Sequence, residues 1–384
     1  MLYISSLLLL CASLFSQPAE AALGMTIQGV TLPPRTIVDS GTELHVSAWV
    51  PYWRKENGTA EAQKAMIYID TFSPFMYEVD STGAIASKAD LKLGNWSSLL
   101  QTARLSGKKI TPSIIWLKGG EIHTVLSDSK KRKKHIDSIV TIMKGSTAYV
   151  SGGYDGIDID YEGKNTETRA GFSAFLTELK AELKKIDKSL ICTLETRNAN
   201  RPYEEQIQRE KEYVNDYKVI NSVCDVVRVM TYDQRNADPV LGKLHETELY
   251  MPVADVAWVQ KVLKTLVKFI DPKKIELGIP TYGHAYKITK KGTGWSYERM
   301  RSLTYVQAME RARLYGGSPT RGASGELTFT YKIPTGEFAG EYLAVLSDAQ
   351  AVRSKIELAE RMGIRGVALF ALYGENDPQL PHDL

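Results

Sequence analysis

Short apolar runs with strand character recur along the chain, separated by amphipathic helical patterns. Most of these runs are almost continuously apolar, which is typical of parallel strands covered on both faces. In the intervening segments 172–186 and 256–270, apolar side chains fall on one helical face. The eight runs are His45–Val50, Met66–Phe72, Lys109–Trp116, Gly156–Glu162, Leu190–Glu195, Val226–Tyr232, Ile275–Tyr282 and Gly366–Leu372.

Strand and helix patterns that alternate in this way predict an α/β fold, a (β/α)8 TIM barrel over residues 43–384. A doubly wound open sheet is the alternative, but the chain lacks a phosphate-binding glycine loop of the dinucleotide type. The alternation breaks between the seventh and eighth runs. There, a helical pattern at Thr304–Tyr315 precedes a strand pair at Leu327–Tyr331 and Glu341–Leu346. We therefore expect a small α+β insertion at 288–345.

The first residues form a separate feature. Residues 2–15 are almost wholly apolar, too short a run to span a bilayer, which takes about 20 residues. The small-x-small pattern Ala19-Glu20-Ala21 follows. We expect a signal peptide at residues 1–21, although its usual basic residues are missing. The expected location is secreted, periplasmic or cell-envelope associated, with no membrane contact after cleavage. A start at Met25 and a lipoprotein anchor at Cys11 are alternatives.

Composition narrows the function classes. The 48 Lys plus Arg against 45 Asp plus Glu give a net charge of +3, too balanced to indicate nucleic-acid binding by bulk charge. Three cysteines exclude a disulfide scaffold, and six scattered histidines show no metal-ligand spacing, so no metal and no cofactor is expected. After signal cleavage Cys192 and Cys224 remain, either as buried thiols or as one disulfide. We expect a monomer.

The segment Asp155–Glu162, Asp-Gly-Ile-Asp-Ile-Asp-Tyr-Glu, carries the candidate chemistry. Alternate residues of a strand share a face, so Asp158, Asp160 and Glu162 point together into the barrel, toward its C-terminal mouth. Carboxylates ~7 Å apart along a buried face repel each other and lose hydration. At least one must hold a proton or have a shifted pKa, as an acid catalyst requires. A metal site and a structural cluster are the alternatives.

This octapeptide fits the D-x-x-D-x-D-x-E signature and resembles glycoside hydrolase family 18, the chitinase-like family. The resemblance covers residues 43–384. Its nearest branch is the bacterial one that acts on peptidoglycan, including spore-cortex N-acetylglucosaminidases. Four further segments are similar to family elements: Trp49–Trp53, Ser73–Tyr77, Met230–Asp233 and Pro280–Gly283.

The resemblance implies substrate-assisted retaining hydrolysis of a polysaccharide that contains N-acetylglucosamine (GlcNAc), either peptidoglycan or chitin. Glu162 would be the general acid and later the base, while the 2-acetamido oxygen of the substrate would be the nucleophile. Asp160 would orient the acetamido group. Asp158 would hydrogen-bond Asp160 and share its proton, and Tyr232 would donate to the acetamido carbonyl.

Met230 and Asp233, which belong to the same segment as Tyr232, are substrate-binding candidates by the same resemblance. Aromatic residues at strand ends are candidates for stacking on sugar faces, with core packing as the alternative for each. These are Trp53, Tyr77, Trp116 and Tyr282. Phe370 ends the eighth run where the family usually has tryptophan, which bears on subsite preference. A chitinase-like lectin and an unrelated barrel enzyme are the competing functions, and the retained Glu162 argues against the lectin.

Overall fold

The computed structural model describes residues 44–384 except 93, 198–200, 202 and 383. The predicted signal peptide at 1–21, with Cys11, lies outside the described residues. No helix of the described part is long and apolar enough to cross a membrane.

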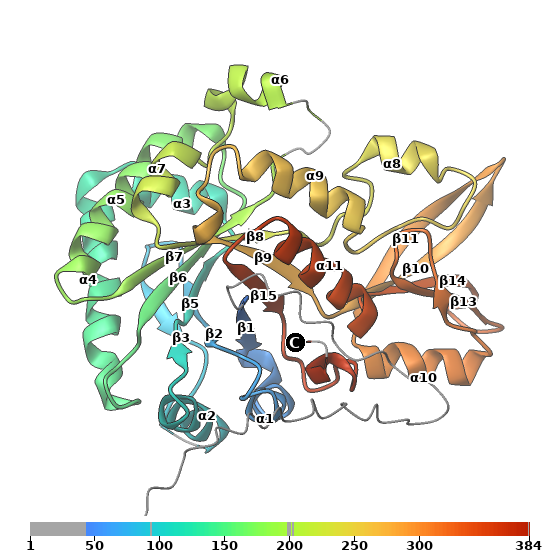
Figure 1. Cartoon of the computed structure of the whole chain (residues 1–384), viewed down its shortest axis with the longest axis horizontal. Coiled ribbons are helices and arrows are strands. Elements are labelled where there is room, and N and C mark those ends of the chain that lie inside the picture. The colour runs from blue at the N-terminus through green and yellow to red at the C-terminus, as the bar shows by residue number, and fades with distance from the viewer. Residues whose placement is uncertain (1–43, 93, 198–200, 202, 383) are drawn as a thin grey trace, which may run out of the picture. The chain divides into compact units, whose positions relative to one another are not determined.

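Parallel strands close into a barrel and confirm the (β/α)8 prediction (Figure 1). The ring closes because β1 pairs with both β15 and β2. Within the described residues the barrel strands are β1 (His45–Pro51), β2 (Thr71–Val79), β5 (Ser113–Trp116), β6 (Gly156–Tyr161), β7 (Ser189–Glu195), β8 (Val226–Met230), β9 (Ile275–Pro280) and β15 (Gly366–Phe370). Two short strands, β3 (Ile85–Ser87) and β4 (Lys109–Ile110), pair with β2.

The second strand differs most from its prediction. The apolar run begins at Met66, but β2 begins at Thr71 and continues to Val79. Met66 and Ile69 lie in the connection between α1 and β2, where both side chains are buried in the core. Burial in a connecting segment, rather than strand geometry, therefore explains why these two residues are apolar.

Helices cover the outside of the barrel (Figure 1). Several begin at an aspartate whose carboxylate accepts hydrogen bonds from first-turn N–H groups, as Asp255 does for α9 and Asp348 for α11. The helices of the barrel are α1 (Asn57–Lys64), α2 (Gly94–Leu105), α3 (Gly119–Leu126), α4 (Ser129–Gly145), α5 (Arg169–Lys184), α6 (Tyr203–Gln208), α7 (Tyr217–Val223), α8 (Pro239–Leu244), α9 (Val256–Leu266) and α11 (Ala349–Arg361). Short 3-10 turns lie at Tyr52–Arg54, Ser146–Ala148, Thr166–Thr168, Glu210–Glu212, Pro272–Lys274 and Leu380–His382.

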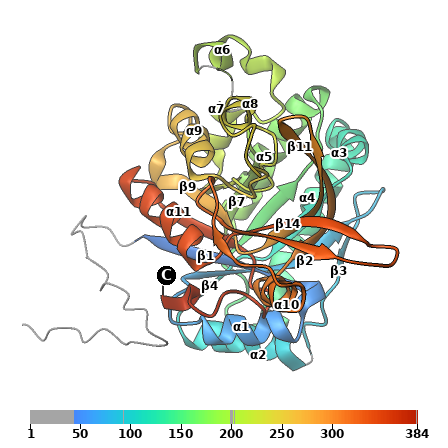
Figure 2. The same cartoon turned by 90° about the vertical axis from the view of Figure 1, so that its right-hand side faces the viewer.

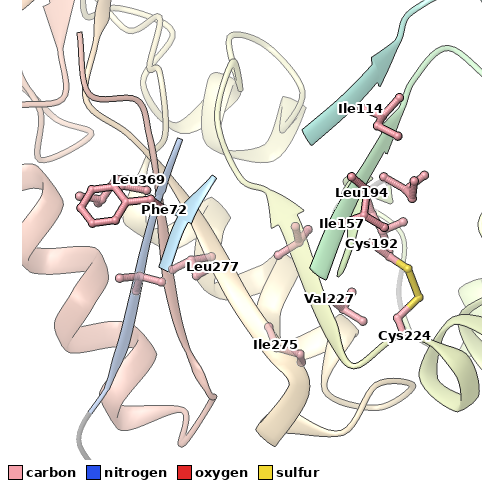
Figure 3. Close-up of a cluster of buried hydrophobic side chains, with 14 of the residues drawn as sticks. Phe72, Ile114, Ile157, Cys192, Leu194, Cys224, Val227, Ile275, Leu277 and Leu369 are labelled. Carbon is pink, nitrogen blue, oxygen red and sulfur yellow. A yellow bond between two sulfur atoms is a disulfide. The ribbon is translucent and has the colours of Figure 1, made fainter. Parts of the chain in front are cut away.

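The main apolar core lies between the strands and these helices. It contains the outward-facing strand residues, such as Ile157, Leu194 and Val227 (Figure 3). Cys192 of β7 and Cys224 at the end of α7 form a disulfide in the same layer, with 6.1 Å between their Cα atoms. Of the two states predicted for these cysteines, the structure has the disulfide.

The insertion is a five-stranded antiparallel sheet with a helix against one face, at the right of Figure 1 and toward the viewer in Figure 2. Its elements are β10 (Gly283–Lys291), β11 (Gly294–Leu303), α10 (Tyr305–Tyr315), β12 (Thr320–Arg321), β13 (Leu327–Ile333) and β14 (Gly340–Leu346).

The sheet starts only two residues after β9, earlier than the expected residue 288. Lys287, Lys290 and Lys291 and the exposed residues of β11 weaken the apolar signal of the first hairpin. Gly283 is required at the start of β10 because a Cβ there would lie 2.1 Å from the Val345 carbonyl oxygen.

Candidate active site

Strand β6 places the predicted carboxyls inside the barrel. Asp158 and Asp160 are buried on its interior face, whereas Ile157 and Ile159 belong to the outer core. Glu162 follows the last strand residue and is half-buried, and its N–H donates to the Trp116 carbonyl at 2.8 Å. The alternation expected from a strand period of two is therefore present, and it ends with Glu162 at the C-terminal mouth of the barrel.

Asp158 lies at the base of this row and is surrounded by donors. Its Oδ2 accepts hydrogen bonds from Trp49 Nε1 at 3.0 Å and Ser113 Oγ at 2.6 Å, and it pairs with the Arg228 guanidinium at 3.2 Å. Its Oδ1 accepts from Thr193 Oγ1 at 2.7 Å. Donors from other barrel strands thus bond both carboxylate oxygens, so Asp158 is held rigidly in place.

Asp160 stands above Asp158 and has a free oxygen. Its Oδ1 is buried and has no hydrogen-bond partner. The sequence analysis expected Asp160 and Asp158 to share a proton, but these two carboxyls do not hydrogen-bond to each other in the structure. The reason is that donors from other strands occupy Asp158. Burial, together with the negative charges of Glu162 and Asp158, raises the pKa of Asp160 well above its usual value. A buried, unsatisfied carboxyl oxygen is suited to accept a hydrogen bond from a ligand.

The Glu162 carboxyl has the electrostatic setting of an acid. Burial raises its pKa, and the nearby charges of Glu195 and Asp233 raise it further, against the opposing charge of Lys164. A carboxyl that keeps its proton to higher pH can deliver it to a leaving group.

Glu195, at the end of β7, was not predicted as a site residue. Its Oε1 accepts from the Gly163 N–H at 2.8 Å, and its Oε2 pairs with Lys164 at 3.2 Å. Gly163 has φ +68°, a left-handed conformation that glycine adopts without strain. Glu195 thus fixes the turn directly after Glu162. The available signal was an acidic residue at the end of the strand that neighbours β6.

Tyr232 and Asp233 follow β8 and face different partners. The Tyr232 ring stacks on Phe370, with centroids 5.4 Å apart and planes at 18°. Burial raises the pKa of Tyr232 well above its usual value, so its hydroxyl remains a donor. Asp233 has φ +54°, and its Oδ1 accepts from Tyr282 at 3.1 Å and from His284 Nε2 at 2.6 Å. His284, on β10, was not predicted as a site residue. Its contact with Asp233 places it in the site.

The charge of Asp233 is set by these partners. Burial alone would raise the pKa of Asp233, but the hydrogen bond and charge of His284, with the bond from Tyr282, outweigh it and the pKa lies below its usual value. Asp233 is therefore ionised and contributes to the raised pKa of Glu162. Met230 ends β8, half-buried, on the same strand face as Arg228.

Aromatic rings form the interior wall beside Tyr232. Phe370 contacts Trp49 and Phe75 edge-to-face, each at 5.6 Å between centroids. Trp53 is 49% exposed, and its ring makes a T-shaped contact with Phe75 at 5.6 Å. Phe75 was missed by the sequence analysis.

Two stacking candidates are wrong, because both lie in the outer core. Trp116 is 1% exposed, packs edge-on against Tyr161, and donates to Glu121. Tyr77 is buried, and its hydroxyl lies 3.2 Å from that of Tyr154. Trp116 has the outward parity of β5, and an irregularity in β2 between residues 75 and 77 turns Tyr77 away from the barrel interior.

The described residues include no group of three or more His, Cys, Asp or Glu side chains arranged to hold a metal ion. The buried carboxyls instead meet hydroxyl, indole and guanidinium donors, as the surroundings of Asp158 show.

Comparisons with known proteins agree with this geometry. A glycosylase of Bacillus subtilis, YvbX, described as uncharacterized, is 26% identical over 255 residues, which are 66% of this chain and 65% of that protein. The chain therefore spans just under two thirds of that relative's length.

Solved structures share the fold. A chitinase from Chromobacterium violaceum superposes with a TM-score of 0.69 at 20% identity, over 89% of this chain and 98% of that one. The spore cortex-lytic enzyme SleL of Bacillus megaterium gives a TM-score of 0.69 at 20% identity, over 88% of this chain and 73% of that one. The family model described as glycosyl hydrolases family 18 matches residues 48–375, so the chain belongs to that family.

Proposed function

We propose that this protein is a glycoside hydrolase that cleaves β-linked GlcNAc glycans, peptidoglycan or chitin, by substrate-assisted retaining catalysis. The observation that carries the proposal is the carboxyl row of β6, where Asp160 has a free buried oxygen and Glu162 has a raised pKa at the barrel mouth. Family membership supports a glycosidase, and the family includes substrate-assisted members.

In the first step Glu162 donates its proton to the glycosidic oxygen. The acetamido oxygen of the sugar attacks the anomeric carbon, the glycosidic bond breaks, and a cyclic oxazolinium ion forms. Asp160 accepts the acetamido N–H through its free oxygen and stabilises the positive charge. In the second step the Glu162 carboxylate takes a proton from water, which attacks the anomeric carbon and reopens the ring with retention.

Tyr232 and Phe370 position the reacting sugar in this scheme. The Tyr232 hydroxyl donates to the acetamido oxygen and keeps it directed at the anomeric carbon. Phe370 offers an apolar face beside it, and the Tyr232–Phe370 stack at 5.4 Å limits how far either ring can move. Because the two rings are already fixed before the substrate reacts, less entropy is lost on reaching the transition state.

The proposed location is outside the cytoplasm: secreted, periplasmic or associated with the cell envelope. The predicted signal peptide and the substrate class both favour it. The Cys192–Cys224 disulfide supports it too, because disulfides persist mainly in oxidising compartments.

The test is Glu162→Gln, assayed on chitin oligomers and on purified peptidoglycan. The substitution keeps the shape but removes the transferable proton, so turnover should fall by about 10²–10⁴-fold while glycan binding remains. Glu182→Gln is the control, because Glu182 pairs only with Lys185 on the surface of α5. A Glu162→Gln protein within tenfold of wild type would refute the mechanism. Wild-type protein that binds both glycans without cleaving them would instead support the lectin function.

A further inference from the structure

A second group of polar side chains lies next to Asp233, on the side of the insertion. Arg235 follows Asp233 by two residues, and its charge helps to lower the pKa of that carboxyl. The backbone of Arg235 is held at φ +49°, and its N–H donates to the Pro252 carbonyl at 2.9 Å. A non-glycine residue in this conformation is uncommon and is held by its surroundings. Its side-chain Nε is buried and has no hydrogen-bond partner.

Arg299 approaches the same place from the hairpin of the insertion. Arg299 pairs with Tyr286 in the β10–β11 register, two pairs along from His284 and Ser302 and past a register shift between residues 285 and 286. One terminal nitrogen of Arg299 lies 3.4 Å from His284 Nδ1 and donates to Ser302 Oγ at 3.0 Å. His284 Nε2 is hydrogen-bonded to Asp233 at 2.6 Å, so only the His284 side chain separates the Arg299 guanidinium from Asp233.

Tyr286 completes the group. Its side chain is 2% exposed, yet its hydroxyl has no hydrogen-bond partner. Burial raises the pKa of Tyr286, while the charges of Arg235 and Arg299 both act in the opposite direction, so both guanidinium groups lie within electrostatic range of this hydroxyl. Neither arginine forms an ion pair with a carboxylate among the residues that the structure describes.

We propose that Arg235, Arg299 and Tyr286 form a subsite for a carboxylate carried by the glycan. The inference rests on the proposed function and deepens it by selecting an acidic GlcNAc glycan over neutral chitin. The Arg235 Nε and the Tyr286 hydroxyl are buried donors without an acceptor, and Arg299 adds an exposed cation that donates to Ser302, so the group matches a carboxylate in charge and hydrogen bonding. Buried donors without a partner are costly, and an anionic ligand would satisfy those of Arg235 and Tyr286.

Peptidoglycan offers two sources of this chemistry. N-Acetylmuramic acid (MurNAc) has a lactyl carboxylate wherever it bears no stem peptide. Where a peptide is attached, the lactyl group is an amide and the peptide supplies carboxylates of its own, whereas chitin has none. An acidic chain that enters the barrel mouth also meets the ionised carboxylate of Asp233, whose pKa the neighbouring His284, Tyr282 and Arg235 hold below its usual value. Arg235 beside Asp233 and Arg299 beside His284 would offset that repulsion and so favour the charged polymer.

The experiment compares kcat/KM for three soluble substrates. These are peptide-free GlcNAc–MurNAc oligosaccharides with free carboxylates, the same oligosaccharides with the carboxylates reduced to alcohols, and oligosaccharides that retain the stem peptides. Wild-type protein should favour the carboxylate form over the alcohol form by about tenfold or more, the effect of a charged hydrogen bond. Arg235→Gln and Arg299→Gln should each reduce this ratio about tenfold. Arg235→Lys, which keeps the charge, should restore part of it.

Arg301→Gln is the matched control. Arg301 is an exposed residue of the same strand, but it pairs with Ala285, which packs in the core under α10, and so lies on the other face of the hairpin. Its variant removes one positive charge from the hairpin and should leave the ratio unchanged. If Arg301→Gln and Arg299→Gln reduce the ratio equally, general electrostatic attraction explains the preference and the subsite is overturned.

The outcomes separate the two levels of the proposal. A preference for the peptide-free carboxylate identifies the lactyl group as the ligand, and a preference limited to the peptide-bearing form identifies the peptide. A wild-type carboxylate-to-alcohol ratio near one, with the peptide-bearing form cleaved no faster than the alcohol form, overturns the subsite and leaves the proposed function standing. If the wild-type protein cleaves neither chitin nor any of the three substrates, the proposed function is overturned and this inference with it.

Discussion

Arg228 lies 3.2 Å from Asp158 inside the barrel, and the two side chains are 1% and 0% exposed. The same guanidinium pairs with Glu276 at 2.9 Å, and Glu276 pairs with Arg365 at 3.1 Å. Charges on β8 and β9 thus support the lowest carboxyl of the β6 row. Because the pairs are buried, removing one partner leaves an uncompensated charge in a medium that solvates it poorly.

The first prediction concerns this network. Arg228→Met, which removes the charge but keeps a side chain of comparable length, should lower the free energy of unfolding by about 3–5 kcal/mol. Urea denaturation followed by circular dichroism measures it. Arg209→Met is the control, since Arg209 pairs with Glu212 on the exposed surface and its removal should leave stability nearly unchanged. Equal losses for the two variants would show that the buried network does not stabilise the fold.

The second prediction concerns pH dependence. A general acid works while protonated, so kcat/KM should decline as pH rises through the pKa of Glu162. Burial and then the charge of Glu195 raise this pKa, with a further contribution from Asp233, and Lys164 opposes them. Glu195→Gln removes a negative charge and leaves Lys164 without its carboxylate, and both changes lower the pKa.

The alkaline limb of the pH profile for Glu195→Gln should therefore move to lower pH. The acid limb serves as an internal reference, and Glu182→Gln on the surface of α5 should leave both limbs in place. A limb that stays fixed, or moves to higher pH, would mean that Glu195 does not act on Glu162 through charge.

The carboxyl row was predictable because strand periodicity is local. In Asp155–Glu162 alternate residues must share a face, and once the barrel is recognised the interior face follows. Tyr77 shows the limit of this argument. Tyr77 is two residues from Phe75 and should point to the same side of a regular strand. The register shift between them turns Tyr77 to the other side, and no residue type in the segment predicts that shift.

Residues that act through distant partners escape a local argument. Glu195 enters the site because β7 pairs with β6. Arg228 and His284 enter it because the barrel and the insertion bring them to Asp158 and Asp233. His284 is separated from its partner Asp233 by 51 positions in the chain. Pairings of this kind depend on the closed topology, which the apolar pattern predicts as a class but not in its side-chain contacts.

The third prediction concerns the disulfide. Cys192 and Cys224 are separated by 32 positions, and closing a loop of that length should stabilise the folded state by about 3–4 kcal/mol. The double variant Cys192→Ala with Cys224→Ala should lose that amount in urea denaturation under oxidising conditions. Under reducing conditions the wild-type protein should approach the double variant. Identical stability in both conditions would mean that the bond does not form in the native protein.

The fourth prediction separates two tryptophans that sequence alone treats alike. Trp53→Ala should raise KM about tenfold with little loss of stability, because in the proposed function the exposed ring would stack on sugar, and it supports little core. Trp116→Ala should instead lower the free energy of unfolding by about 3–5 kcal/mol, since it removes a ring packed against Tyr161. Thermal denaturation and steady-state kinetics on both variants test the contrast. A large increase in KM for a folded Trp116→Ala protein would show that Trp116 contributes to substrate binding after all.

The last prediction tests the nucleophile. Tyr232→Phe keeps the stack on Phe370 but removes the hydroxyl that, in the proposed mechanism, donates to the acetamido oxygen. Because that bond matters most as the ring closes, kcat should fall about a hundredfold while KM changes little. Tyr315→Phe, on the exposed surface of α10, is the control. Substrates without the 2-acetamido group should be inert to every variant, and a thiazoline mimic of the cyclic intermediate should inhibit the wild type. Efficient cleavage of plain β-glucosides would exclude the acetamido oxygen as nucleophile even if Glu162 proved essential, because the anomeric carbon would then be attacked by some other group.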